Sequence, residues 1–267
     1  MPGTDDATTT RLTAPALSGV RRLSALEAVR ARIALAVDLG LLSPGERLPA
    51  TARIAEALGV AEITARRALV RLCADGVLER RRGRGGGTLV AERPPRGTVV
   101  ATDAYRSDTA AVHQLIDHRL VLECGIAHLA SVRVGEEDLA ELRSLVEEME
   151  RAPSWAEFHG SDERFHLRLA RATGVPSVTG QYGAVLRELY RYYLPYPLDA
   201  LRASNDEHRM LLDALERRDA AAAGEVARRH VEVLHRTMFV GLLDGGAGDD
   251  AGAGDDSGAG ARARADR

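Results

Sequence analysis

Apolar residues recur at helical spacing, with few interruptions, from about Asp108 to residue 242, and this run constrains the fold more than any other feature. Apolar side chains three and four residues apart share one face of a helix, which must be buried against a partner. Turn signals divide the run into candidate helices at residues 109–132, 135–151, 154–173, 176–194, 197–217 and 219–242. Long amphipathic helices with short connections predict an antiparallel all-α bundle.

The segment before residue 93 has a different pattern. One candidate helix runs from Leu23 to Gly40, and "SPGERLP" then predicts a turn. The stretches "ATARIAEALGV" and "AEITARRALVRLCADGV" predict two further helices around a tight turn, and Val77–Arg80 and Thr88–Ala91 predict two short strands. Three helices followed by a hairpin are typical of a winged helix-turn-helix domain. The predicted fold class is therefore mainly α, with one small β hairpin.

These patterns divide the chain into two domains with a linker and two tails. We expect a disordered segment at 1–20, a winged helix-turn-helix domain at 21–92, a linker at 93–108, a helical domain at 109–242 and a disordered tail at 243–267. The first segment lacks periodicity, and the last is a low-complexity run of Gly, Ala and Asp. Two adjacent prolines in the linker favour an extended chain.

Charge is distributed unevenly along the chain. The formal net charge is −3, yet residues 21–93 hold 14 arginines and only 8 acidic residues, so the remainder is acidic. Genome composition could explain why every basic residue is arginine, but it does not explain the clustering. A basic unit on an acidic protein indicates a polyanionic partner for that unit.

The sequence contains no sign of a membrane or a secreted location. No apolar run approaches the roughly 20 residues needed to cross a bilayer. The first residues, "MPGTDDATTT", lack the apolar segment of a secretory signal. We therefore expect a cytoplasmic protein without membrane contact.

The third candidate helix and the loop of the hairpin carry arginines suited to DNA. The second helix of a helix-turn-helix pair enters the major groove, and Arg66, Arg67 and Arg71 lie on or beside it. In the loop "RRRGRGGG", Arg82 and Arg84 can reach phosphates or the minor groove. A merely solvated basic loop is the alternative. Because the loop follows a helix-turn-helix pattern, we predict binding to double-stranded DNA.

Several motifs of this domain resemble the DNA-binding domain of the GntR family of bacterial transcription regulators. They are "PGERLP" at 44–49 and "LGV" at 58–60, together with Gly40, Arg66, Ala68-Leu69, Leu72, Gly76 and Gly83. The resemblance implies DNA contacts by Thr64, Arg66 and the wing tip Arg84-Gly85. The chain departs from many relatives by having Glu62 at the start of the recognition helix, and Ala52 beside Arg53 in the helix before it. Glu62 could accept a hydrogen bond from cytosine or could repel phosphate.

Four residues of the helical domain have the types and spacing of a metal site. Asp162 and His166 lie four residues apart and so share a helix face. His208 and His230 lie at nearly equal distances on either side of the turn at Asp219, so an antiparallel hairpin places them level. Three imidazoles and a carboxylate suit Zn²⁺, Ni²⁺, Mn²⁺ or Fe²⁺ rather than Ca²⁺. A hydrogen-bonded pair of core residues remains the alternative for Asp162 and His166.

The helical domain also resembles the FCD ligand-binding domain of the FadR subfamily. The stretches that carry the resemblance are "HRLVLECGIAHLA", "DERFHLRLA", "EHRMLLDALERRDAAAA" and "ARRHVEV". Many such domains bind a divalent metal, and the resemblance implies as ligands Asp162, His166, His208 and His230. It also implies that Arg119, which forms an i,i+4 pair with Glu123, receives the carboxylate of an effector. The asparagine that many relatives have near Thr173–Val175 is absent here.

Together these features predict a metabolite-responsive transcription regulator, expected to act as a repressor rather than as an enzyme. A small carboxylate effector would bind through a divalent metal, for which zinc is our first choice. The family resemblance implies a homodimer on a two-fold operator. Two other readings stay open at this point: a metalloenzyme of the helical domain, and a regulator that senses the metal directly or holds it as a structural element.

Overall fold

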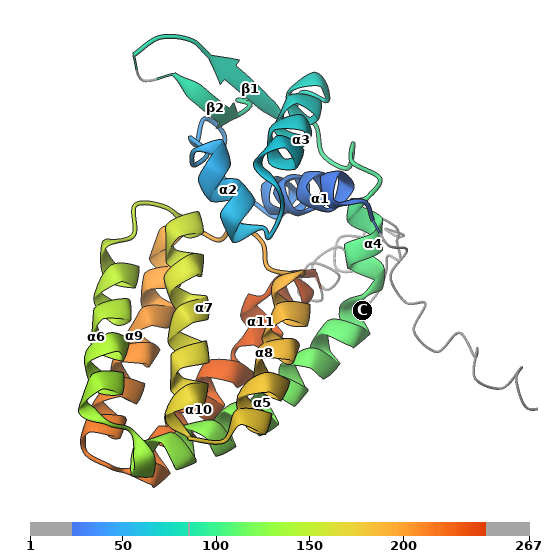
Figure 1. The fold of residues 1–267 in the computed structure, drawn as a ribbon. Helices are drawn as coiled ribbons and strands as arrows, with labels where there is room; N and C mark the ends of the chain where they lie inside the picture. Colours follow the sequence, from blue (N-terminus) through green and yellow to red (C-terminus); the bar gives the residue numbers. More distant parts are fainter. Residues whose placement is uncertain (1–22, 85, 244–267) are drawn as a thin grey trace, which may run out of the picture.

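The computed structural model describes residues 23–84 and 86–243, which form a small N-terminal unit seated on a larger helical bundle (Figure 1). The N-terminal unit consists of α1 (Ala25–Asp38), α2 (Thr51–Ala57), α3 (Glu62–Ala74), β1 (Leu78–Arg81) and β2 (Gly87–Val90). The bundle consists of α4 (Thr102–Ser107), α5 (Thr109–Arg133), α6 (Glu136–Arg151), α7 (Trp155–Ala172), α8 (Pro176–Tyr190), α9 (Leu198–Glu216), α10 (Ala220–Glu232) and α11 (Leu234–Thr237). The mainly α fold with one hairpin is as predicted.

The N-terminal unit is held together by the apolar faces of its three helices. Ser24 caps α1 by accepting a hydrogen bond from the Glu27 amide, at 3.2 Å. Ile33 of α1 and Leu69 and Leu72 of α3 are almost completely buried, and α1 packs along α3. Burial of these side chains fixes which face of α3 remains outside.

The hairpin differs from the prediction by one residue at the ends of each strand. Leu78 pairs with Val90 in an antiparallel register, and the strands span 78–81 and 87–90. The segment before α2 adds a short third pairing, because the Leu48 amide donates to the Thr88 carbonyl at 2.9 Å and Arg47 bridges Leu89. This pairing ties the base of the wing to the start of α2.

Helices of the bundle pack mainly as antiparallel neighbours. α5 lies along α10 and α6 lies along α7, while α9 contacts both α6 and α10. Asp219 caps α10 through the Ala222 amide at 2.9 Å, after Arg218 has turned the chain with a positive φ of 57°. The α9–α10 hairpin thus has its tight turn at the predicted place.

The structure differs from the predicted elements in three places. The segment 93–108, predicted as a linker, contains the short helix α4, in which Tyr105 is buried against Tyr192 and Phe239. The helix predicted for 219–242 breaks after α10, and the chain continues through α11 to another helical stretch at 239–243. α8 ends at Tyr190 rather than at residue 194. The amides of residues 191–193 donate to carbonyls three residues earlier instead of four, and the prolines that follow prevent the helix from continuing.

The segments predicted to be disordered, 1–20 and 243–267, lie outside the described residues except for residue 243. Within the described residues, no helix is both long and apolar enough to cross a membrane.

His159 of α7 gives a testable pH dependence of stability. It is buried between the rings of Tyr190 and Tyr193, and burial lowers its pKa to about 4, partly offset by Asp162. The folded protein then binds fewer protons than the unfolded chain between about pH 4 and 6.5, so stability falls as the pH drops through that window. From pH 6.5 to 5 the wild-type free energy of unfolding should fall about 2 kcal/mol more than that of His159→Phe.

Urea denaturation of both proteins at several pH values measures this difference. His118→Phe, at an exposed histidine of α5, is the control and should follow the wild type. If the free energy of unfolding changes with pH equally in the wild type and in His159→Phe, then protonation of His159 does not contribute to the pH dependence of stability.

Candidate metal centre and nucleic-acid interface

The outer face of α3 is a mixed basic and apolar surface. Arg66, Arg67 and Arg71 are all exposed on it, as are two large apolar side chains, Ile63 at 61% and Val70 at 51%. Sequence reasoning missed Ile63 and Val70. The signal was available, because neither belongs to the buried helical face, and exposed apolar groups on a reading helix can contact thymine methyl groups.

Glu62 and Arg66 form an ion pair on this surface, with 2.9 Å between Arg66 Nη2 and Glu62 Oε1. The acidic departure at the start of α3 is thereby compensated within the helix, and Thr64 lies half-buried beside it. Arg53 of α2 is more than half exposed and pairs with Glu56 of its own helix at 3.0 Å, while its Nε lies 3.5 Å from Glu157 Oε1 of α7. A DNA contact by Arg53 would compete with these two pairs.

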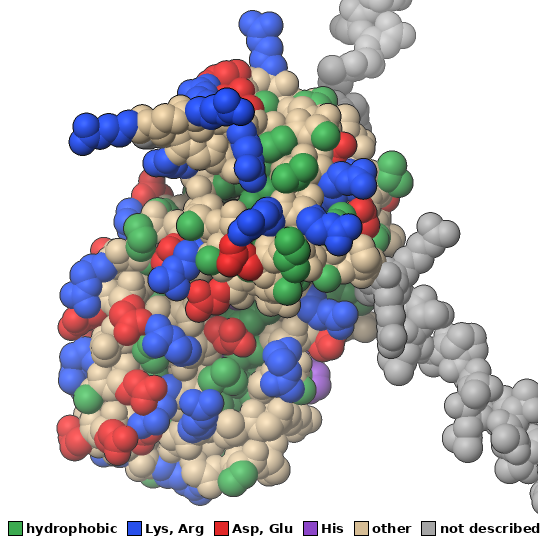
Figure 2. Space-filling view, turned by 45° about the horizontal axis from the view of Figure 1, so that its top comes forward, with side chains coloured by type: hydrophobic (Ala, Val, Ile, Leu, Met, Phe, Trp, Pro, Cys, Tyr) green, Lys and Arg blue, Asp and Glu red, His purple; other side chains and the backbone are tan. Residues whose placement is uncertain are grey.

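The wing carries exposed arginines beyond the end of the bundle. Arg82 and Arg84 are exposed, and among the described residues no acidic group pairs with either. Arg81 is held by Glu79 and Glu92, at 2.7 and 2.9 Å. Gly85 is not described. Figure 2 shows basic side chains projecting from the hairpin end of the molecule, whereas acidic side chains are frequent on the bundle.

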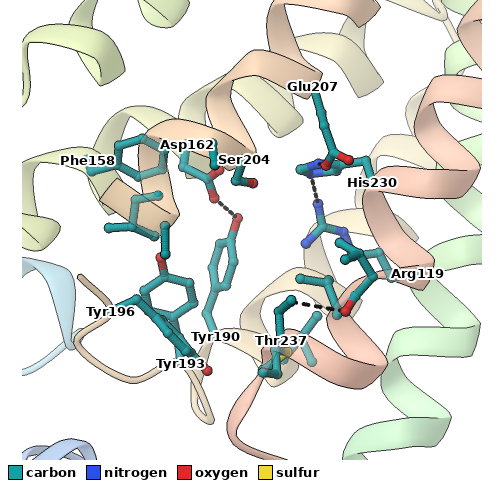
Figure 3. A pocket seen from close by; sticks show the side chains of 17 residues that line it. Arg119, Phe158, Asp162, Tyr190, Tyr193, Tyr196, Ser204, Glu207, His230 and Thr237 are labelled. Carbon is teal, nitrogen blue, oxygen red and sulfur yellow. Dashed lines mark hydrogen bonds and ion pairs between the residues drawn. The ribbon is translucent and has the colours of Figure 1, made fainter. Parts of the chain in front are cut away.

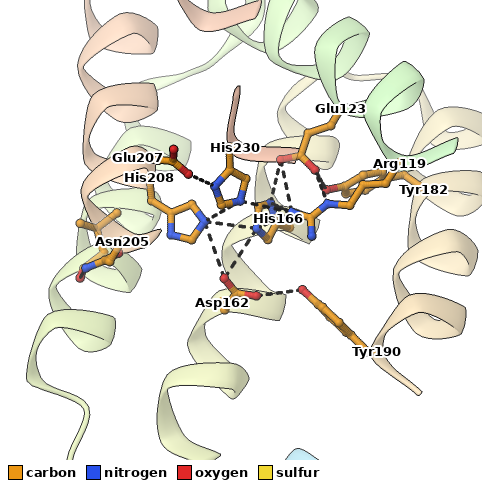
Figure 4. A network of polar contacts seen from close by, with 11 residues as sticks. Arg119, Glu123, Asp162, His166, Tyr182, Tyr190, Asn205, Glu207, His208 and His230 are labelled. Atoms are coloured by element: carbon orange, nitrogen blue, oxygen red, sulfur yellow. Dashed lines mark hydrogen bonds and ion pairs between the residues drawn. The ribbon is translucent and has the colours of Figure 1, made fainter. Parts of the chain in front are cut away.

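Three histidines from three helices converge in the interior of the bundle (Figure 4). The Nε2 atom of His208 lies 3.2 Å from that of His166 and 3.3 Å from that of His230. Asp162 Oδ1 lies 3.7 Å from the Nε2 atom of His166 and 3.6 Å from that of His208. The predicted set of four residues is therefore brought together by α7, α9 and α10, and all four are buried.

The spacing of these atoms fits a single small cation. Two nitrogens bound to Zn²⁺ at about 2.0–2.1 Å with a tetrahedral angle lie about 3.3–3.4 Å apart, which matches the two separations between His208 Nε2 and the other Nε2 atoms. Burial lowers the pKa of His208 well below its ordinary value, so its ring is neutral and able to ligate. Asp162 is ionised, because the neighbouring His166 outweighs the effect of burial and lowers its pKa.

Two carboxylates outside the set orient the histidine rings. Glu123 Oε1 lies 3.3 Å from His166 Nδ1, and Glu207 Oε2 lies 2.9 Å from His230 Nδ1. Carboxylates at Nδ1 hold the ring so that Nε2 faces a metal, and they increase its basicity. Sequence reasoning missed Glu207, although its place directly before His208 put it on the same hairpin as His230.

Arg119 and Glu123 form a buried ion pair beside the histidines. Arg119 Nε lies 2.6 Å from Glu123 Oε2, and Tyr182 donates a hydrogen bond of 2.5 Å to the same oxygen. Burial opposes ionisation of Glu123, but the Arg119 guanidinium outweighs it and lowers the pKa of Glu123. Arg119 Nη2 also reaches 2.9 Å from His166 Nε2. The Arg119 guanidinium thus lies directly at the cluster, and a metal bound by His166 Nε2 would require it to move away from that atom.

A cavity of about 270 Å³ opens onto the same cluster (Figure 3). Arg119, Asp162 and His230 are part of its wall, whereas Glu123 is not. The lining residues Ala200 and Thr237 are exposed, so the cavity reaches solvent between α9 and α11. A bound molecule would therefore touch Arg119, Asp162 and His230 at the inner end of the cavity, while Glu123 would act only through its neighbours.

Comparisons with known proteins agree with this architecture. Residues 25–90 match the model of the gntR family of bacterial regulatory proteins, and residues 114–233 match the FCD domain. The Uxu operon transcriptional regulator of Escherichia coli is 30% identical over 71% of this chain and 77% of its own length. The Exu regulon transcriptional regulator of the same species is 26% identical over 73% of this chain and 77% of its own length.

Among solved structures, a GntR protein of Streptococcus agalactiae is 24% identical, with a TM-score of 0.44 over 79% of this chain and 99% of that one. The matches to the two family models fall on the two structural units, and one curated relative reaches 30% identity over most of its length. The chain therefore belongs to the GntR family of bacterial regulatory proteins, with a winged helix-turn-helix domain followed by an FCD domain.

Proposed function

We propose that this protein is a cytoplasmic transcription repressor whose helical domain binds a small organic acid at a divalent metal. The proposal is supported by the meeting of three Nε2 atoms and the Arg119 guanidinium next to an open cavity, whose wall includes Arg119, Asp162 and His230. A metal ion and a guanidinium this close repel each other unless an anion lies between them. A carboxylate compensates both, with one oxygen toward each cation.

Asp162, His166, His208 and His230 would hold the metal, and Arg119 would receive the acid. This donor set of nitrogen and carboxylate oxygen is suited to Zn²⁺ first, and to Ni²⁺, Mn²⁺ or Fe²⁺ as well. The bound metal would supply a Lewis-acidic site for a carboxylate oxygen. Glu123 and Glu207 would orient the rings of His166 and His230 and so fix the geometry of the site.

On the DNA side, α3 and the wing would contact a double-stranded operator. We propose base contacts from the exposed face of α3 and phosphate contacts from Arg82 and Arg84. A homodimer would present two such units to a two-fold operator. The acid would favour a dimer geometry that no longer matches the operator, and DNA affinity would fall by the difference in binding between the two geometries.

Two other functions predict different results. A direct metal sensor would release DNA on metal binding alone. A metalloenzyme would consume the bound acid, which requires a general base at the cavity. Asp162 and Glu207 are the acidic residues among the described lining residues, and each already faces a histidine. The site therefore favours binding over turnover.

Fluorescence anisotropy of the full-length protein on an operator selected in vitro from random duplexes tests the proposal. We expect tight binding with zinc present and weaker binding when zinc and a small carboxylic acid are both present. Release by zinc alone would support the sensor, and loss of the acid during incubation would support the enzyme.

A further inference from the structure

The cavity has two chemically different ends. Its inner end is polar and is formed by Arg119, Asp162, Glu207 and His230. The rest of the wall is mainly apolar or aromatic, and it includes Phe158, Leu189, Tyr193, Leu201, Leu234 and Met238. A ligand whose carboxylate lies at the inner end would therefore place its remaining atoms against hydrocarbon.

Most hydroxyl groups of the wall already have partners within the protein. Tyr190 donates to Asp162 Oδ2 at 3.0 Å and Thr237 donates to the Val233 carbonyl at 3.0 Å, while Tyr196 accepts from the Phe239 amide at 3.0 Å and can still donate its own O–H. Among the described residues, only the Ser204 and Tyr193 hydroxyls of the wall have no hydrogen-bond partner. A ligand with many hydroxyl groups would leave several of them unpaired on burial, which lowers affinity.

We propose that the effector is a monocarboxylic acid with an apolar tail, such as a medium-chain aliphatic acid or a single aromatic ring, rather than a polyhydroxylated acid. This inference rests on the proposed function, since the polar end anchors the carboxylate. The cavity of about 270 Å³ has room for roughly nine groups the size of a water molecule, at about 30 Å³ each. Acids of about that many heavy atoms fill it.

Titration calorimetry of the zinc-loaded full-length protein tests the inference with acetate, butyrate, hexanoate, benzoate and gluconate. Each added CH₂ group should raise affinity about fourfold until the cavity is filled. Hexanoate and benzoate should bind at least tenfold more tightly than gluconate. Tighter binding of gluconate, or equal affinity along the aliphatic series, would overturn this inference and leave the proposed carboxylate site standing. If none of the acids binds, the effector part of the proposed function fails, and this inference fails with it.

A matched pair of variants locates the tail. Leu234 lines the cavity, and Leu120 of α5 is similarly half-buried outside it. Leu234→Ala should weaken hexanoate binding about tenfold, leave acetate binding unchanged and reduce the gain per CH₂ group. Leu120→Ala should bind both acids as the wild type does. Equal effects of the two substitutions would place the tail elsewhere.

Arg32 joins the two domains through hydrogen bonds to three backbone carbonyls. Arg32 belongs to α1 and is 4% exposed. Its Nε donates to the Tyr193 carbonyl at 2.6 Å, its Nη2 to the Tyr190 carbonyl at 3.0 Å, and its Nη1 to the Leu58 carbonyl at 3.4 Å. One guanidinium of the DNA-binding unit thus binds the end of a helix in the bundle.

These carbonyls stabilise the buried positive charge of Arg32 by accepting its hydrogen bonds. Tyr190 is the last residue of α8 and Leu58 is the C-cap of α2, so their carbonyls lack partners within these helices and lie at the negative ends of the helix dipoles. The Tyr190 carbonyl also accepts from the Tyr193 amide at 3.1 Å. Among the described residues, no carboxylate forms an ion pair with Arg32. Moving either helix end would leave the guanidinium unpaired in the interior, which is unfavourable.

The hydroxyl of the same Tyr190 donates to Asp162, one of the residues assigned to the metal. The geometry points to Arg32 as the residue that couples occupancy of the metal site to the position of the DNA-binding unit. A change at Asp162 moves Tyr190, and the Tyr190 carbonyl moves with it. Arg32 then transmits the change to α1 and to the end of α2. Arg32 is a positioning residue in this scheme and contacts neither metal nor DNA.

Hydrogen exchange of the full-length protein, with and without zinc, tests this coupling. In the wild type, zinc should slow exchange in α7 and α9 and also in α1 and α2. Arg32→Met should keep the effect in α7 and α9 and lose it in α1 and α2. Arg30→Met is the control, since Arg30 pairs with Glu27 and Asp75 inside the DNA-binding unit, and it should behave as the wild type does.

Two outcomes would overturn the coupling. Undiminished protection of α1 and α2 in Arg32→Met would show that another contact transmits the change. A wild-type protein that takes up no zinc by metal analysis would remove the metal site itself, and the coupling with it.

Discussion

Replacing His208 with alanine is expected to lower the zinc affinity of the protein by at least about 100-fold, since loss of a partner outside the ligand set already costs about 10- to 100-fold. His208 has the central position in the cluster, with its Nε2 atom 3.2 and 3.3 Å from the other two. Its removal leaves two imidazoles and one carboxylate. Metal analysis after dialysis against a competing chelator gives the affinity.

The control for this prediction is His113→Ala. His113 stacks on His235, away from the cavity, and the same substitution there should leave zinc affinity unchanged. Thermal melting of both variants without zinc separates loss of a ligand from loss of the fold. Equal zinc affinity in His208→Ala and the wild type would remove His208 from the site.

The second large effect concerns DNA. Arg66→Ala is expected to weaken operator binding about 10- to 100-fold while changing binding to random duplex much less, as befits a residue that contacts bases. The substitution also frees Glu62, whose carboxylate is paired with Arg66 in the structure, to repel the phosphate backbone. Anisotropy titrations on a selected operator and on a scrambled duplex measure the two affinities.

Two further variants distinguish base contacts from phosphate contacts. Arg82→Ala in the wing should weaken binding to both duplexes about equally. It should also lower the slope of log affinity against log salt concentration by about one, as expected for the loss of one phosphate contact. Arg171→Ala, at an exposed position of the bundle, should change neither affinity. If Arg66→Ala weakens both duplexes equally, then Arg66 contacts the backbone and the specificity lies elsewhere on α3.

Helical periodicity and turn signals predicted much of the fold, but they could not predict how tertiary packing ends or breaks a helix. The α9–α10 hairpin was predictable because Asp219 caps α10 just beyond the turn. The break between α10 and α11 was not, because the apolar pattern continues through it. The helix within the predicted linker was missed for a similar reason, since Tyr105 is held there by partners from distant parts of the chain.

The candidate site was predictable to a similar degree. The spacing of four residues predicted that Asp162 and His166 share a helix face. The antiparallel α9–α10 hairpin predicted that His208 and His230 lie beside each other. The contacts of Arg119 with His166 and of Glu207 with His230 depend on how α5, α7, α9 and α10 cross, which local sequence does not determine. The cavity wall has the same origin, because it is assembled from six helices and the loop that follows α8.

The most direct test is an anomalous difference map from crystals of the wild-type protein grown with zinc and soaked with hexanoate. We expect one strong peak enclosed by the Nε2 atoms of His166, His208 and His230 and the carboxylate of Asp162. We also expect density for a carboxylate between that peak and Arg119. A zinc-loaded crystal without a peak at this position, or with zinc only at His113 and His235, would show that these four residues do not hold the metal.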